Sequence, residues 1–136
     1  MAEWGCQYQY SHEQIAGHLA DGFTRVSRTP TVCLVGPEGF ANAIPAMMEA
    51  WGERSPVIFL TGSSTLKRQG SGGFKEIDDV AIAKPLTKYS ASITDGERIP
   101  EFVDRAFKIA PADIQAQFTL VYLLILCSVP SRNLQV

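Results

Sequence analysis

The residues best suited to chemistry near the start of the chain are His12, Glu13 and His18. A glutamate beside a histidine invites comparison with the zinc motif H-E-x-x-H, whose two histidines share one face of a helix. Here the second histidine follows the first by six residues, which turns it about 120° away around an α-helix. We therefore expect the two histidines not to share a metal, and we predict no metal site.

Motifs that hold nucleotides or activate a serine have fixed spacings that this sequence lacks. The turn Gly36-Pro-Glu-Gly39 is not the G-x-G-x-x-G of dinucleotide-binding folds, and no G-x-x-x-x-G-K-[ST] occurs. Gly62-Ser63-Ser64 follows a predicted strand, but it is not the G-x-S-x-G of serine hydrolases. Dinucleotide and P-loop binding are therefore excluded, and a hydrolase is unsupported.

Composition restricts the class of protein and of partner. The 136 residues are 46% hydrophobic and 19% charged, with a formal net charge of −2, which is typical of one globular domain. Without an excess of positive charge we expect no nucleic-acid partner. The three cysteines, Cys6, Cys33 and Cys127, form no metal-binding spacing, so we expect reduced thiols.

The longest apolar run extends from Phe118 to Val129. It is shorter than the ~20 residues that cross a bilayer, so we expect a buried strand or an atypical tail. The first residues do not combine a positive region with an apolar stretch, so no secretory signal is expected. We predict no membrane partner and a cytoplasmic location.

An amphipathic helix is predicted between Ser11 and Val26. Its apolar residues recur at spacings of four, four and three, and form a stripe that we expect to be buried: Ile15, Leu19, Phe23 and Val26. Ser11 and Gln14 fit a capping box at its start. Glu13 lies in the first turn, where an acid ordinarily complements the helix dipole.

Strands and helices alternate along the rest of the chain. Thr31–Val35 and Pro56–Thr61 are predicted to be strands buried on both faces, as in a parallel sheet. A helix capped by Asn42 is expected between them, residues 62–73 are expected to form a surface loop, and a last helix begins near Pro100. This alternation predicts an α/β fold with parallel strands.

The order of several short motifs is more specific than any one of them. The motifs are His12-Glu13-Gln14 with Ala20-Asp21-Gly22-Phe23 and Arg25, Val32–Val35 with Gly39 and Asn42, Pro56–Gly62, Gly73–Asp78, and Lys84–Lys88. This order resembles the pyrimidine-binding (PYR) domain of thiamine-diphosphate enzymes, the group of acetolactate synthase, benzaldehyde lyase and 2-hydroxyacyl-CoA lyase. The resemblance covers residues from about Tyr10 to Ala110.

The resemblance implies a three-layer αβα fold with a mainly parallel sheet, in the form of an incomplete PYR domain. We expect a lead-in over residues 1–10, the PYR domain over residues 11–110 and an atypical apolar tail over residues 111–136. A strand and a helix that precede H-E-Q in the family are not recognised in this sequence. Loss of a strand would leave apolar helix faces exposed.

The family's glutamate at this helix start hydrogen-bonds N1′ of the cofactor's aminopyrimidine, so the resemblance makes Glu13 the catalytic residue. Sharing a proton with N1′ favours the imino form at N4′, whose nitrogen removes the thiazolium C2 proton to generate the ylid. A helix start lowers the proton affinity of a carboxylate, whereas proton sharing requires a raised one. Burial by the cofactor and a second protein surface must therefore prevail.

The resemblance also implies roles for four other residues. Gly39 and Asn42 belong to the turn that binds the cofactor, and Phe74 is similar to an aromatic residue beside the thiamine or the substrate. Lys75 stands where the F-Q-E pattern places a glutamine that faces the reacting centre. A cation there favours a substrate with an acidic group or indicates lost activity.

The family's magnesium and diphosphate anchor, G-D-G followed by paired asparagines, does not occur in this sequence. The chain is therefore expected to bind only the pyrimidine end of thiamine diphosphate. Its expected partner is a diphosphate-binding domain of another subunit or chain, in a homo- or hetero-oligomer.

Two functions remain open. One is a share in an acetolactate synthase-like carboligase, decarboxylase or lyase acting on 2-oxoacids and inactive alone; the other is a non-catalytic remnant or interaction module.

Overall fold

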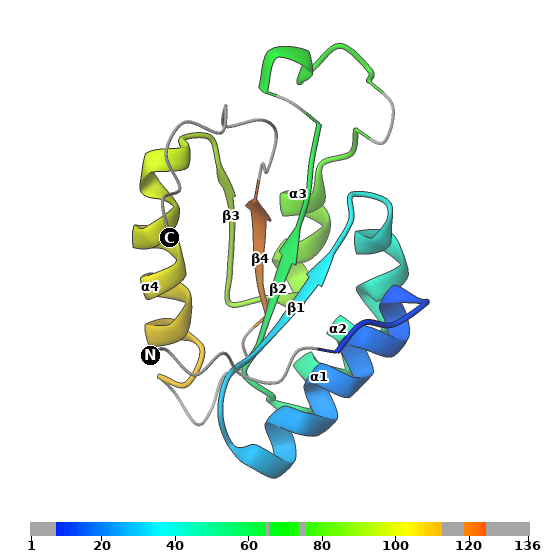
Figure 1. Cartoon of the computed structure of the whole chain (residues 1–136), viewed down its shortest axis with the longest axis vertical. Helices are drawn as coiled ribbons and strands as arrows, with labels where there is room; N and C mark the ends of the chain where they lie inside the picture. Colours follow the sequence, from blue (N-terminus) through cyan, green and yellow to red (C-terminus); the bar gives the residue numbers. More distant parts are fainter. Residues whose placement is uncertain (1–7, 65, 74–75, 113–118, 125–136) are drawn as a thin grey trace.

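The computed structural model describes residues 8–64, 66–73, 76–112 and 119–124. Within these residues, one parallel sheet has the strand order β1-β2-β4-β3. Its strands are β1 (Thr31–Val35), β2 (Val57–Thr61), β3 (Tyr89–Ile93) and β4 (Thr119–Leu124). The α-helices are α1 (Glu13–Ser27), α2 (Gly39–Glu53), α3 (Asp79–Ala83) and α4 (Ile99–Ile109) (Figure 1). Short 3₁₀ helices span Leu66–Arg68, Lys84–Leu86 and Gly96–Arg98.

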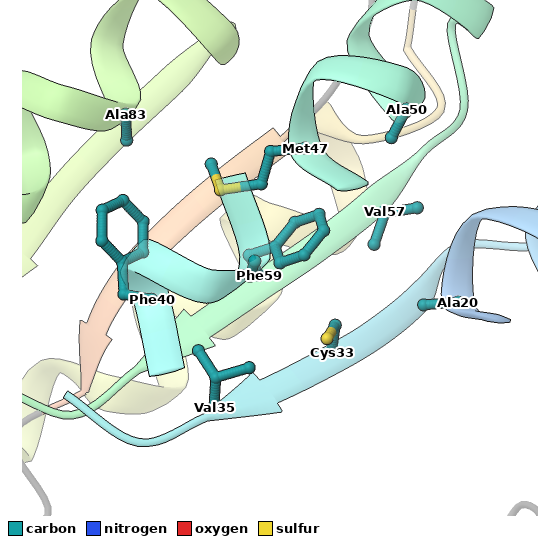
Figure 2. Close-up of a cluster of buried hydrophobic side chains, with 10 residues drawn as sticks. Ala20, Cys33, Val35, Phe40, Met47, Ala50, Val57, Phe59 and Ala83 are labelled. Carbon is teal, nitrogen blue, oxygen red and sulfur yellow. The ribbon is translucent and has the colours of Figure 1, made fainter. Parts of the chain in front are cut away.

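Apolar cores cover both faces of the sheet. Because successive strand residues point to opposite faces, Val57 and Phe59 of β2 meet α1, α2 and α3, whereas Ile58 meets α4. Figure 2 draws the first core, which includes Cys33, Val35, Phe40, Met47 and Ala83. The second contains Ile93, Phe102, Ala106 and Ala110. Two helical layers enclose the sheet, so the predicted αβα fold is confirmed.

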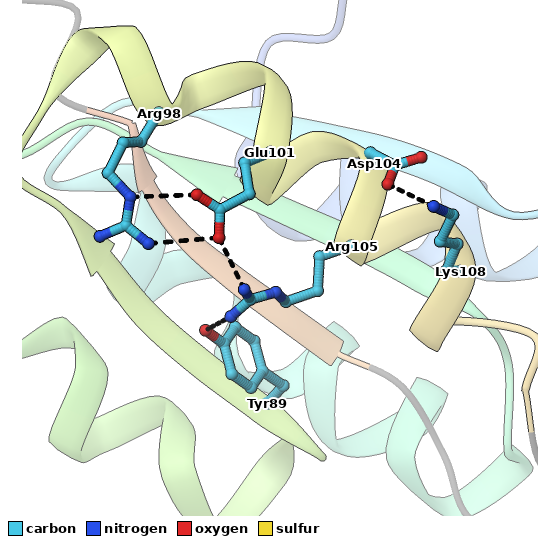
Figure 3. Close-up of polar contacts among 6 residues, drawn as sticks. All are labelled: Tyr89, Arg98, Glu101, Asp104, Arg105 and Lys108. Carbon is cyan, nitrogen blue, oxygen red and sulfur yellow. Dashed lines mark hydrogen bonds and ion pairs between the residues drawn. The ribbon is translucent and has the colours of Figure 1, made fainter.

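Polar contacts also hold α4 against β3. Arg105 donates to the hydroxyl of Tyr89 over 3.2 Å, and Glu101 accepts from both Arg98 and Arg105 (Figure 3). The arginine guanidinium groups also lie over the rings of Tyr89 and Phe102. Exposed ion pairs contribute little stability individually, so these contacts mainly fix the orientation of the helix.

The prediction that β1 is buried on both faces is wrong. Cys33 and Val35 are buried, but Val32 and Leu34 are 42% and 62% exposed. β1 lies at the edge of the described sheet, and α4 packs over the strands at the other side (Figure 1). One face of β1 is therefore uncovered by any described helix.

The apolar stripe of α1 is exposed, where the sequence pattern predicted burial. The exposed fraction reaches 56% at Phe23 and 87% at Val26. The residues of α1 that are buried are small or polar: Gly17, Ala20, Asp21 and Thr24. Small residues permit a close approach of α1 to α2. The face of α1 that is buried is therefore the face with small side chains and not the most hydrophobic one. No described element therefore covers the apolar stripe of α1.

The helix ends differ in detail from the sequence prediction. His12 caps α1 in place of Ser11, since its ring Nδ1 accepts from the backbone N–H of Gln14 over 3.2 Å. α2 begins at Gly39 and continues through Pro45, so Asn42 lies inside the helix and does not cap it. These changes place Glu13 and Gly39 at the first positions of their helices.

The long apolar run near the C-terminus contributes a strand of the sheet. β4 pairs in parallel with both β2 and β3, which confirms the strand interpretation of this run. β3 was not predicted from its residues, because Tyr89-Ser-Ala-Ser-Ile93 is less apolar than the other strands. No helix among the described residues is long and apolar enough to span a membrane.

Candidate cofactor-binding site

The site forms where the first residues of α1 and α2 meet. The two helices pack closely because Gly17 of α1 lies against α2. A Cβ atom at this glycine would lie 2.5 Å from the Cβ of Ala46 and 3.3 Å from the ring of Phe59. This close crossing brings the start of α1 beside the start of α2, which follows β1 at the carboxyl edge of the sheet.

Glu13 lies directly against Gly39. A Cβ atom at Gly39 would lie 2.8 Å from both Cδ and Oε1 of Glu13 and would overlap its Cγ. Real Cβ contacts are essentially never under 3.0 Å, so any side chain at this position would displace the carboxylate. Glycine at this position therefore allows the Glu13 carboxylate to lie where it does, because of close approach and not because of an unusual backbone angle.

Asn42 completes the contact by donating from Nδ2 to Oε2 of Glu13 over 3.1 Å. The pKa of Glu13 is lowered from its ordinary value, first by a hydrogen bond from its own backbone N–H and then by the one from Asn42. Partial burial opposes these effects without reversing them. In the chain alone Glu13 is thus an ionised, partly exposed carboxylate held in one orientation.

A charged network fixes α1 relative to α2. Buried Asp21 accepts from Arg25 at 3.1 Å and 2.5 Å, and the same guanidinium pairs with Glu49 at 3.2 Å and Glu53 at 3.4 Å. The hydrogen bonds that Arg25 donates to the Asp21 carboxylate raise the pKa of Arg25. Asp21 and Arg25 belong to one of the sequence motifs, which did not indicate their structural role; in the structure they hold the helix that carries Glu13.

The sequence-predicted site residues divide into two groups. Glu13, Gly39 and Asn42 are brought into mutual contact, whereas Phe74 and Lys75 lie outside the described residues. Glu76, the next residue in the sequence, is described: its carboxylate accepts from the backbone N–H groups of Gly70 and Gly73, the latter over 2.8 Å. These bonds lower the pKa of Glu76 and close the loop after β2.

A parallel αβα sheet with a helix-start glutamate against a glycine and an asparagine is the arrangement expected of a PYR domain. The sequence profile described as "Thiamine pyrophosphate enzyme, N-terminal TPP binding domain" matches residues 7–82. The chain belongs to this family, and its fold is the α/β fold of the thiamine diphosphate-binding PYR domain.

The chain is similar to several larger enzymes. It is 43% identical over 101 residues to the "Probable acetolactate synthase large subunit" of Methanocaldococcus jannaschii, covering 73% of this chain and 17% of that protein. It is 35% identical over 136 residues to the mitochondrial acetolactate synthase of Schizosaccharomyces pombe, covering 90% and 20%. For the "Sulfoacetaldehyde acetyltransferase" of Castellaniella defragrans, identity is 33% over 125 residues, covering 88% and 21%. The chain spans about a fifth of the length of these curated relatives.

The donor set fits the pyrimidine end of the cofactor. A carboxylate at a helix start, with one oxygen held by the Asn42 amide, offers a hydrogen-bond acceptor suited to a ring that presents a protonated nitrogen. Among the described residues, no group of three or more His, Cys, Asp and Glu could hold a metal ion. The groups of this site are hydrogen-bonding groups suited to the ring.

Proposed function

We propose that this chain supplies the pyrimidine half of an acetolactate synthase-like active site, with Glu13 hydrogen-bonded to N1′ of thiamine diphosphate. The observation that carries the proposal is the contact of the Glu13 carboxylate with Gly39 on one side and Asn42 on the other. When bound, the cofactor supplies a carbon nucleophile that adds to a substrate carbonyl. The residues of this chain orient the ring and hold one proton.

In this proposal the Glu13 carboxyl group and N1′ share a proton across a hydrogen bond. Its lowered pKa in the chain alone favours the ionised form, so the carboxylate accepts a hydrogen bond from a protonated ring nitrogen. Covering the site excludes water, which penalises the ionised form and raises the proton affinity of the acid. Proton transfer between carboxylate and ring is therefore controlled by closure of the site.

Closure requires a second protein surface, because Glu13 is only partly buried in this chain. We propose that a diphosphate-binding domain of another subunit or chain covers it and holds the diphosphate with magnesium. Those charged groups ordinarily contribute much of a cofactor's affinity. The chain alone is then expected to bind thiamine diphosphate weakly and to have no activity of its own.

The substrates we propose are 2-oxoacids, handled by a carboligase or decarboxylase. Support comes from the names of the relatives, two of which are acetolactate synthases. Lys75 would favour an acidic group on the substrate, and Phe74 would lie beside the thiamine or the substrate. The predicted cytoplasmic location stays a prediction.

A complementation experiment tests this function. A full-length acetolactate synthase whose own corresponding glutamate has been changed to glutamine is mixed with this chain, thiamine diphosphate and Mg²⁺, and pyruvate consumption is followed. We expect the wild-type chain to restore activity and Glu13→Gln to restore none. Equal activity with both chains would refute the catalytic role. No activity with either chain, despite complex formation, would favour a non-catalytic interaction module on the same scaffold.

A further inference from the structure

β1 has an open edge on the side away from β2. Of the described strands, only β2 lies beside it. The backbone N–H of Thr31 donates to the carbonyl of Pro56 at the start of β2 over 3.3 Å. The backbone groups of successive residues point to alternate sides of a strand. The N–H and C=O groups of Val32 and Leu34 therefore point to the open edge.

The sequence of β1 does not protect this edge from pairing. Edge strands of natural sheets are commonly protected by a charged side chain, a proline or a bulge. Thr31–Val35 contains no charged residue and no proline, and it pairs with β2 in an unbroken register. Val32 and Leu34 are also 42% and 62% exposed, on the face of β1 that no described helix covers. The edge is thus apolar as well as unpaired.

The exposed apolar stripe of α1 lies at the same side of the molecule. α1 packs over β1 and against α2, opposite α4 (Figure 1). The stripe residues are between 44% exposed at Leu19 and 87% exposed at Val26. Between Ile15 and Val26, the only acid and the only Arg or Lys are Asp21 and Arg25, which pair with each other. No unpaired acid, Arg or Lys of this range therefore opposes burial of the stripe.

The exposed apolar area at this side is large enough for a stable dimer. At the exposed fractions of the α1 stripe, Val32 and Leu34, this area is on the order of 600 Å² per chain. The same surface on two chains gives about 1,200 Å², which is the lower limit of the standard size of a stable interface. A second copy of this chain therefore has enough apolar surface to cover the first.

We propose that this edge is a dimer interface, in which two copies pair antiparallel along β1 about a two-fold axis at Cys33. In this register Val32 of one copy lies opposite Leu34 of the other, and each pair exchanges two backbone hydrogen bonds. All the outward-pointing groups of Val32 and Leu34 are then bonded. The axis is perpendicular to the sheet, so the two α1 helices lie on one side of it, antiparallel, with opposite ends of their dipoles facing. This inference does not depend on the role of Glu13.

Sedimentation equilibrium and amide hydrogen exchange of the 136-residue chain test the proposal. We expect a monomer–dimer equilibrium between about 1 and 100 µM, and slower exchange of the Val32 and Leu34 amides as the dimer forms. Leu34→Lys is expected to raise the dimer dissociation constant at least about tenfold, because it places a charge at the edge. Phe23→Lys is expected to do the same through the α1 stripe. Both positions are exposed, and circular dichroism checks that the variants fold.

Ile77→Lys is the matched control. Ile77 is also an exposed aliphatic residue, at 52%, and it lines a cavity beside the end of β3, the strand at the other edge of the sheet. We expect its dissociation constant to equal that of the wild type. A monomer at all these concentrations, association beyond a dimer, or equal effects of Leu34→Lys and Ile77→Lys would overturn the proposal. So would amide protection of Val32 and Leu34 that is independent of concentration, because another segment of the same chain would then occupy the edge.

Discussion

The carboxylate of Glu13 and the backbone of Gly39 occupy space that leaves no room for a Cβ atom between them. This relationship joins two residues that are 26 positions apart in the sequence and that begin two different helices. The absence of a side chain at Gly39 is what allows the Glu13 carboxylate to take this position. The pair therefore forms one structural unit, with Asn42 as the donor that orients the carboxylate.

Gly39→Ala is expected to move the Glu13 side chain while leaving the fold intact. Alanine favours a helix by up to about 1 kcal/mol over glycine, which partly offsets the overlap. We expect the free energy of unfolding to change by no more than about 1 kcal/mol and thiamine diphosphate affinity to fall at least about tenfold. Urea unfolding and calorimetric titration measure the two effects.

Gly52→Ala is the control for this substitution, because Gly52 also lies in α2 and a Cβ there meets no described atom within 4 Å. It should stabilise the helix and leave cofactor binding unchanged. If Gly39→Ala bound the cofactor as Gly52→Ala does, the Glu13–Gly39 contact would have no part in recognition.

Asn42→Ala is expected to raise the pKa of Glu13 toward its ordinary value. The change removes one of the two hydrogen bonds that lower that pKa and leaves the one from the Glu13 backbone. An NMR titration of the glutamate carboxyl groups measures the shift. The pKa of Glu76, which backbone donors lower, should stay constant as an internal reference. An unchanged Glu13 pKa would mean that Asn42 does not bind the carboxylate in solution.

Gly17→Ala is expected to destabilise the chain by about 1–3 kcal/mol, because the added Cβ overpacks the α1–α2 contact. The overlap is with Ala46, whose Cβ would lie 2.5 Å away. Gly22→Ala in the same helix places its Cβ where no described atom lies within 4 Å, so it should gain up to about 1 kcal/mol from helix propensity. Chemical denaturation of both variants separates packing from propensity. Equal stabilities would disprove the close crossing.

Asp79 is expected to make the stability of the chain fall as pH rises from about 4 to about 7. Its folded pKa of about 6 lies above its ordinary value of 3.8. Its favourable contribution is therefore complete below pH 3.8 and is lost as the pH rises through the folded pKa. At full ionisation the loss relative to Asp79→Asn is on the order of 3 kcal/mol.

Urea unfolding of the wild type and of Asp79→Asn across this pH range measures the Asp79 contribution as the difference between their free energies of unfolding. The difference is needed because Glu13, Glu76 and Glu101 have lowered pKa values and contribute in the opposite direction at lower pH. A constant difference between wild type and Asp79→Asn would contradict the burial of this acid.

The sequence pattern predicted the strands correctly where helices cover both faces, and it predicted burial wrongly where one face is left uncovered. β2 was recognised because its residues are apolar and β-branched and because the strand is covered on both faces. The burial of β1 on both faces and of the α1 stripe was predicted wrongly. An apolar side chain indicates that burial would be favourable, but it does not indicate whether another element covers it. Coverage depends on the strand order, and β1 lies at the edge of the described sheet.

The candidate site was predicted through motif order and not through local physics. Taken alone, an acid at position 13 is explained by its favourable interaction with the helix dipole. The positions of Gly39 and Asn42 in the sequence do not predict that these residues contact Glu13. Their contact arises from the close crossing at Gly17, which is a tertiary effect. Asp79 was missed because an acid at the start of a short helix is ordinary, and its burial depends on the surrounding fold.

The most direct test of the Glu13–N1′ hydrogen bond compares two ligands that differ at one ring atom. The chain and its Glu13→Gln variant are each titrated, by NMR, with thiamine diphosphate and with the analogue in which N1′ is replaced by a C–H group. We expect the wild type to prefer thiamine diphosphate by about tenfold or more and Glu13→Gln to lose most of this preference. Equal binding of the two ligands by the wild type, or an undiminished preference in the variant, would contradict this hydrogen bond.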